Sequence, residues 1–143
     1  MFASGLQAFQ ETLSQAGVTL LVGSSNYDPA QEFTQIQSLL SQGADGLLLI
    51  GEARPEKTRN FLAQHSVPHV LAWCFPKTGG SHAVGFDNQK SGYAIAEHVI
   101  AHGHRKLSVI AGLRDGNDRA QDRIIGIQGA VNAHPEVRLL GLE

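Results

Sequence analysis

Uninterrupted apolar runs alternate along the chain with segments in which apolar residues recur every three or four positions. The uninterrupted runs predict strands buried on both faces of a parallel sheet, at 18–24, 45–51, 67–73, 82–86, 106–112 and 137–142. The recurring spacing predicts amphipathic helices, at 2–17, 28–43, 55–65, 89–102 and 118–133. Right-handed connections between such strands give an α/β fold with a doubly wound parallel sheet.

Turn and capping residues support these boundaries. Asp28 and Pro29 stand where a helix takes its N-cap and its first residue, and Gly43 stands where that helix ends. The proline and glycines of 75–80 predict a loop. The chain begins on a helix without a preceding strand and stops on a strand without a following helix, so we expect it to be a fragment of a longer protein.

Composition narrows the class of protein. The 143 residues suit one domain, and the hydrophobic content of 42% and charged content of 17% are typical of a soluble globular chain. A net charge of −2 argues against a chain that binds nucleic acid as a whole. The single cysteine, Cys74, cannot form an internal disulfide. Without a basic leader or an apolar run of about 20 residues, the chain is predicted to be cytoplasmic and not attached to a membrane.

Three histidines near the end of the fourth helix allow two interpretations. His98 and His102 are four residues apart, the spacing of the zinc-binding H-E-x-x-H motif, but no glutamate lies between them. Alternatively, Gly103 ends the helix, and His102 and His104 lie near its negative end, where cations are favoured. We favour the second interpretation and predict no metal site.

Signatures of catalysis are missing from the sequence. Neither glycine-rich phosphate-binding motif occurs, and no G-x-S-x-G nucleophile elbow is present. Cys74 lacks a flanking catalytic signature, so a packed thiol is favoured over a reactive one. We therefore predict no cofactor, no catalytic residue and no enzymatic activity.

Polar residues follow several predicted strands, at the sheet edge where open α/β folds bind ligands. Trp73 ends one strand, Asp87 and Asn88 follow the next, and a polar stretch at 113–123 precedes the last helix. Hydrogen-bonding groups beside a flat indole suit a polar small molecule. The alternatives are helix capping for Asp87 and Asn88, a surface ion pair for Arg123 and core packing for Trp73.

Four segments together carry a family resemblance: GADGLLLIG, VPHVLAW, VGFDNQKSGYAIAEHVIAHGHRKLSVIAG and RIIGI. In this order and spacing they resemble the effector-binding core of the LacI/GalR family of bacterial transcription regulators, over essentially the whole chain. The resemblance implies a type I periplasmic-binding-protein-like fold with the ligand between two lobes. Residues 1–104 would be an N-terminal lobe without its first strand, and 105–143 the beginning of the C-terminal lobe.

The same resemblance implies a set of ligand-binding residues. Arg123 matches the arginine that grips the effector, and Asp87 matches the aspartate of the family's D-N turn. Trp73 falls at a pocket position, and Asn117 and Arg119 fall where members vary their effector contacts. Ile127 replaces the usual aromatic residue, a departure that affects packing. The AW ending of the third strand leans toward regulators of gluconate-type sugar acids.

By this resemblance the chain senses a sugar or sugar acid, and effector binding changes the DNA affinity of a full-length homodimer. Contact with operator DNA would require a helix-turn-helix that this chain lacks. The main alternative is a periplasmic sugar-binding protein of a transport system, which would carry a secretory leader upstream. An enzyme of the doubly wound class would instead turn its ligand over.

Overall fold

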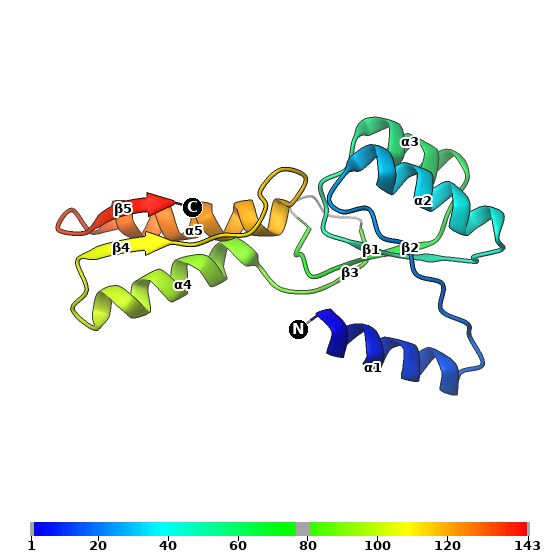
Figure 1. Ribbon diagram of the computed structural model, residues 1–143, viewed down its shortest axis with the longest axis horizontal. Coiled ribbons are helices and arrows are strands. Elements are labelled where there is room, and N and C mark those ends of the chain that lie inside the picture. The colour runs from blue at the N-terminus through cyan, green and yellow to red at the C-terminus, as the bar shows by residue number, and fades with distance from the viewer. Residues whose placement is uncertain (1, 77–80, 143) are drawn as a thin grey trace.

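The computed structural model describes residues 2–76 and 81–142, and most of its elements fall into two groups (Figure 1). The N-terminal group comprises α2 (Pro29–Ser41), β1 (Leu47–Ile50), α3 (Glu56–Gln64), β2 (His69–Ala72) and β3 (Ala83–Val84). The C-terminal group comprises α4 (Asn88–Ala101), β4 (Lys106–Val109), α5 (Asp118–Ala133) and β5 (Arg138–Leu142). Helix α1 (Phe2–Gln15) belongs to neither group.

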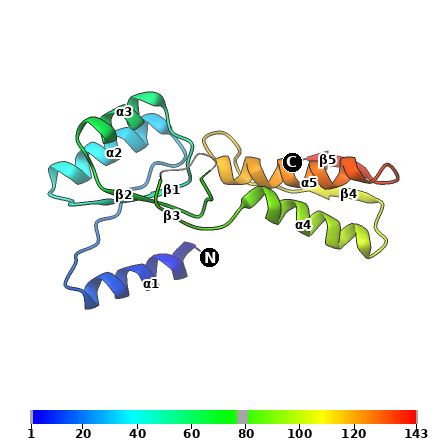
Figure 2. The ribbon, with the colours of Figure 1, turned by 180° about the vertical axis from the view of Figure 1, so that it is seen from behind.

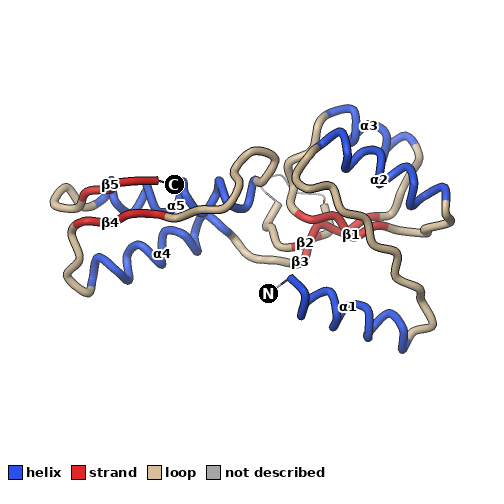
Figure 3. The backbone as a smooth tube through the Cα atoms, in the orientation of Figure 1, coloured by secondary structure: helices blue, strands red, loops and turns tan. Residues whose placement is uncertain are grey.

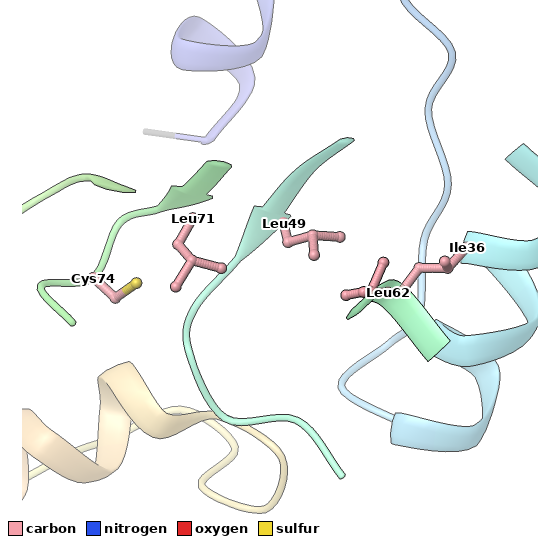
Figure 4. Close-up of a cluster of buried hydrophobic side chains, with 5 residues drawn as sticks. All are labelled: Ile36, Leu49, Leu62, Leu71 and Cys74. Carbon is pink, nitrogen blue, oxygen red and sulfur yellow. The ribbon is translucent and has the colours of Figure 1, made fainter. Parts of the chain in front are cut away.

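The N-terminal group is a small parallel sheet with helices on one face. Strands β1, β2 and β3 are hydrogen-bonded neighbours in that order. Helices α2 and α3 cover one face of the sheet, and α1 lies on the opposite side (Figures 1 and 2). Burial of an aliphatic side chain contributes about 1.5–3 kcal/mol, and five buried residues form the core of this group (Figure 4): Ile36, Leu49, Leu62, Leu71 and Cys74.

The C-terminal group pairs β4 with β5 in parallel and packs α4 against α5. Its core consists of Ile100 from α4, Leu107 from β4 and Val137 before β5. The two helices approach backbone to backbone, because a Cβ atom at Gly92 or Gly126 would overlap a carbonyl oxygen of the other helix. Glycine is the one residue type that permits such an approach.

Two segments bring the groups together (Figure 3). Residues 85–87 lead from β3 into α4, and the loop 110–117 brings the first turn of α5 beside the end of β1. In that loop Gly116, with φ +67°, lies so close to the carbonyl oxygen of Tyr27 that a Cβ atom would not fit. The carboxyl ends of β1 and β2 therefore face the beginnings of α4 and α5.

The predicted fold class is confirmed, since every strand pairing in the described residues is parallel and helices follow strands along most of the chain. The five predicted helices are all present, with ends within about two residues of the predicted ones, the margin expected of boundary assignments. The loop predicted at 75–80 lies partly outside the described residues, because 77–80 are not described. The family resemblance assigns residues 1–104 to the N-terminal lobe, whereas helix α4 contributes Ile100 to the core of the C-terminal group. The lobe boundary between 104 and 105 stays a prediction.

The strand predicted at 18–24 is wrong, because this segment has no regular secondary structure. Most of its apolar side chains are exposed, with Val18 at 50% and Val22 at 65%. A strand needs a neighbour to complete its hydrogen bonds, and none of the described strands pairs with this segment. Four other predicted strands are each three residues too long, because 45–51, 67–73, 82–86 and 106–112 form only β1, β2, β3 and β4. After β4 ends at Val109, Ile110 is 90% exposed.

No helix in residues 2–76 and 81–142 combines the length and apolar character needed to cross a membrane.

Candidate functional site

A buried amide connects the end of β2 to helix α5. Asn88, only 4% exposed, donates from Nδ2 to the carbonyl oxygen of Trp73 at 2.9 Å. Its Oδ1 accepts a hydrogen bond from Nη1 of Arg123 at 2.6 Å. The amide thus joins two of the residues for which the sequence predicted a binding role.

Trp73 has an unusual backbone conformation at this junction. Its φ of +58° lies in the left-handed region, which bulky residues seldom adopt. Its amide donates to the carbonyl of Val84 at 2.8 Å, and Gly85 packs against the Trp73–Cys74 peptide without room for a Cβ atom. The indole lies near α1, since a Cβ atom at Gly5 would be 3.0 Å from its Cζ2.

Asp87 caps helix α4. Its Oδ1 accepts from the backbone amide of Lys90 at 2.9 Å, and its Oδ2 lies 3.8 Å from the Lys90 ammonium. The capping interpretation of Asp87 is therefore confirmed, and a ligand role for its carboxylate stays a prediction.

A second bridge joins the end of β1 to the start of α5. Oδ2 of Asp118 accepts hydrogen bonds from the backbone amides of Glu52 at 2.5 Å and Ala53 at 2.8 Å. Its Oδ1 accepts from the backbone amide and the guanidinium of Arg119, at 2.8 and 2.9 Å. Gly51, with φ +81°, has no room for a side chain because Arg119 and Asp118 lie against it.

Opposing effects set the pKa of Asp118. Burial raises the pKa, but hydrogen bonds from the amides of Ala53 and Glu52, together with the charge of Arg119, hold it below its ordinary value. Asp118 is therefore a carboxylate at neutral pH, paired with an arginine that is 7% exposed.

Arg54 supports the same turn from within the N-terminal group. Its Nη1 donates to the carbonyl of Gly51 at 2.7 Å, and its Nη2 lies 3.1 Å from Oε1 of Glu32. The Arg54 side chain is 3% exposed. Charged groups of both signs thus surround the carboxyl end of β1.

Asn117 is the N-cap of α5. Its Oδ1 accepts from the amide of Ala120 at 3.3 Å and its Nδ2 donates to the carbonyl of Leu113 at 3.0 Å. It is 8% exposed. The capping bonds explain why asparagine suits this position, and a ligand role for Asn117 stays a prediction.

Among the described residues, the predicted binding residues make two sets of contacts at the junction of the groups. Trp73 and Arg123 meet at Asn88, next to Asp87, whereas Asn117 and Arg119 lie in the first turn of α5 beside the end of β1. A separate open hollow of about 390 Å³ contains none of the five, and it is lined by Arg114, Asp115, Gln121, Ile124, Ile125 and Gln128.

The histidines end a helix, as the favoured interpretation states. His102 is the C-cap residue of α4, and its Nδ1 lies 2.7 Å from the carbonyl oxygen of His98. Among the described residues, no group of three or more histidine, cysteine or acidic side chains is arranged to hold a metal ion.

Cys74 is a packed thiol in the first core. Burial raises its pKa, and the nearby carboxylates of Asp118 and Glu52 raise it further. The thiol therefore stays protonated at neutral pH and is a weak nucleophile, which favours the packing interpretation over a reactive one.

Two residues of the bridges were absent from the predicted binding set. The sequence indicates Asn88 only as a polar or capping residue at a strand end, and it indicates no binding role for Asp118. Their bonding partners lie 35 and 66 residues away in sequence. Local signals could have suggested only that both stand at helix starts, where Asn and Asp are common.

Comparison with known proteins connects this arrangement to a family. Residues 2–143 match the family described as periplasmic binding protein domain. The chain is 31% identical to the HTH-type transcriptional regulator GntR of Pseudomonas aeruginosa, over 80% of this chain and 34% of that protein. It is 27% identical to the HTH-type transcriptional repressor PurR of Klebsiella pneumoniae, over 95% of this chain and 40% of that protein. The chain thus spans about a third of the length of the first of these relatives.

Solved structures agree with this comparison. A LacI family transcriptional regulator from Silicibacter pomeroyi superimposes with a TM-score of 0.86 at 26% identity, covering 99% of this chain and 53% of that one. The transcription regulator GntR from Chromobacterium violaceum gives 0.82 at 29% identity, covering 93% and 48%. A Caulobacter myo-inositol binding protein gives 0.78 at 18% identity, covering 99% and 50%, which shows a shared fold alone. The resemblance to the LacI/GalR family is confirmed.

Proposed function

Because the chain belongs to the periplasmic binding protein domain family, we propose that it is part of the effector-sensing module of a LacI-type transcriptional regulator. The effector is a sugar, a sugar acid or a similarly polar metabolite. The observation that carries the proposal is the meeting of Trp73, Asn88 and Arg123 at the junction of the two groups. The names of the relatives, which are regulators, favour this function over a transport component.

Arg123 has the chemistry for the central contact. A guanidinium carries five N–H donors in a planar fork, and the bond to Asn88 uses one of them. Its residue is exposed, so an incoming hydroxyl or carboxylate can reach it. Asp87 and Asn117 offer further polar groups, Arg119 a second guanidinium, and Trp73 a flat apolar face for a sugar ring.

The remaining expectations belong to the whole regulator. We propose a cytoplasmic homodimer whose two lobes meet near residues 104 and 105 and change their relative position when the effector binds. Operator DNA would be bound through a helix-turn-helix outside this chain, and effector and operator affinity would be coupled reciprocally. No catalytic step is part of this function.

Calorimetric titration of the full chain with D-gluconate, D-fructose, myo-inositol and hypoxanthine tests the proposal. At least one of these compounds should bind without being converted. Arg123→Ala should weaken that binding about 10- to 100-fold, because a hydrogen bond to a charged group contributes about 1.5–3 kcal/mol.

The matched control is Arg138→Ala, which removes an exposed arginine at the start of β5. Its affinity should equal that of the unsubstituted chain. The proposal fails if none of the four compounds binds, if a bound compound is chemically converted, or if Arg123→Ala binds as tightly as the control.

A further inference from the structure

We infer that Asn88 is the positioning residue of this site: one buried amide fixes the backbone that carries the Trp73 indole and holds the Arg123 guanidinium. The inference rests on the proposed function in that it takes Trp73 and Arg123 as ligand contacts. Asn88 itself is 4% exposed and is assigned no contact with the ligand.

Its bonding partners dictate which way the amide points. The carbonyl oxygens of Trp73 and Phe86, at 2.9 and 3.4 Å, can only accept, so the Nδ2 donor must face them. A guanidinium can only donate, so Oδ1 must face Arg123. Asparagine satisfies both sides at once, whereas an aspartate would place an oxygen against two carbonyl oxygens.

The first effect of this amide is on Trp73. A residue with φ +58° persists only where its surroundings hold it. Here the Trp73 amide is held by Val84 and its carbonyl by Asn88. Removal of the Asn88 bond takes away the restraint on the Trp73 carbonyl, so the Trp73 backbone relaxes toward the common φ range and the indole changes direction.

The second effect concerns the two groups of elements. Asn88 is the first residue of α4, and α4 is locked to α5 by the close approach at Gly92 and Gly126. Asn88 and Arg123 therefore move together as parts of the C-terminal group. The bond from Asn88 to Trp73 links this unit directly to the residue that carries the indole, so it contributes to the position of the guanidinium relative to the indole.

The test uses Trp73 as its own reporter, since it is the one tryptophan in the sequence. Near-ultraviolet circular dichroism and acrylamide quenching of its fluorescence are measured without ligand. Asn88→Asp keeps an acceptor for Arg123 but loses the donor to Trp73, and Asn88→Ala loses both. Each variant should change the tryptophan dichroism by about half or more, and should raise the quenching constant about twofold.

Two controls separate positioning from stability and from surface charge. Val137→Ala removes methyl groups from the second core, and Asn60→Asp makes the same chemical change at an exposed position on α3. Both should leave the Trp73 signals unchanged. If the Asn88 variants do not fold, Arg123→Ala serves instead: it frees Oδ1 of Asn88 and should shift the signals in the same direction by a smaller amount.

A titration distinguishes this inference from the proposed function. Where D-gluconate or D-fructose binds the unsubstituted chain, Asn88→Ala should weaken that binding about tenfold. If neither compound binds, that arm counts against the proposed function, while the ligand-free Trp73 signals still decide the role of Asn88. Trp73 signals that stay as in the unsubstituted chain, in folded Asn88 variants or in Arg123→Ala, would overturn the inference.

Discussion

Gly126→Ala is expected to lower the free energy of unfolding by about 2–3 kcal/mol, the cost typical of inserting a methyl group where none fits. Its Cβ atom would overlap the carbonyl oxygen of Gln89 and lie 2.8 Å from the backbone nitrogen of Tyr93. Both obstacles are backbone atoms of α4, so no side chain can move aside. Urea denaturation followed by circular dichroism measures the change.

Gly129→Ala provides the matched control on the same helix. The nearest atom to its Cβ would be Cδ2 of Tyr93 at 3.6 Å, an ordinary contact distance. Alanine in a helix is favoured over glycine by about 0.5–1 kcal/mol, so this variant should be slightly more stable than the unsubstituted chain. Equal stabilities for the two variants would contradict the close packing of α4 on α5.

The second large effect is expected at Asp118. Asp118→Ala removes the acceptor for two backbone amides and leaves the guanidinium of Arg119, 7% exposed, without its carboxylate partner. Breaking a buried ion pair by removing one partner costs about 3–5 kcal/mol. Since the Asp118 side chain is 18% exposed, we expect about 3 kcal/mol, the lower end of that range.

The pH dependence of stability gives Asp118 a second signature. Its pKa in the folded chain lies below the value of about 3.9 for an unfolded aspartate. The folded state therefore prefers the carboxylate, and the stabilisation is fully present above about pH 4. It is lost as the pH falls from there through the lower folded pKa.

The asparagine side chain in Asp118→Asn does not ionise, so this variant should lose less free energy of unfolding than the unsubstituted chain as the pH falls below about 4. Asp115→Asn, an exposed position three residues earlier, should keep the behaviour of the unsubstituted chain at every pH. Parallel stability curves for the unsubstituted chain and Asp118→Asn below pH 4 would show that the carboxylate is not held as described.

Local features of the fold could be predicted from sequence because their causes are local. Asp28 caps α2 by accepting from the amide of Ala30, and Pro29 is the first helical residue, as the sequence indicated. The prediction of a strand at 18–24 was wrong because a strand forms only beside a neighbouring strand, and no local sequence pattern specifies that neighbour. An uninterrupted apolar run predicts where a strand would be buried, and only pairing with a neighbouring strand decides whether it forms.

The candidate site was harder to predict for the same reason. The sequence and the family resemblance predict a binding role for Arg123, but they could not show that its hydrogen-bond partner is Asn88, 35 residues earlier. Nor could they show that Asp118 accepts a hydrogen bond from Glu52 in the turn after β1, 66 residues earlier in the sequence. Both residues stand at helix starts, where local reasoning attributes Asn and Asp to capping alone.

Hydrogen exchange at the Asp118 bridge would report whether the two groups separate from each other. The amides of Glu52 and Ala53 donate to a side chain of the other group rather than to a strand of their own sheet. Their hydrogens can therefore exchange with solvent whenever α5 separates from β1, even while both cores stay folded. Faster hydrogen exchange at these two amides than at the amides of the strands would show that the groups separate without unfolding of either core.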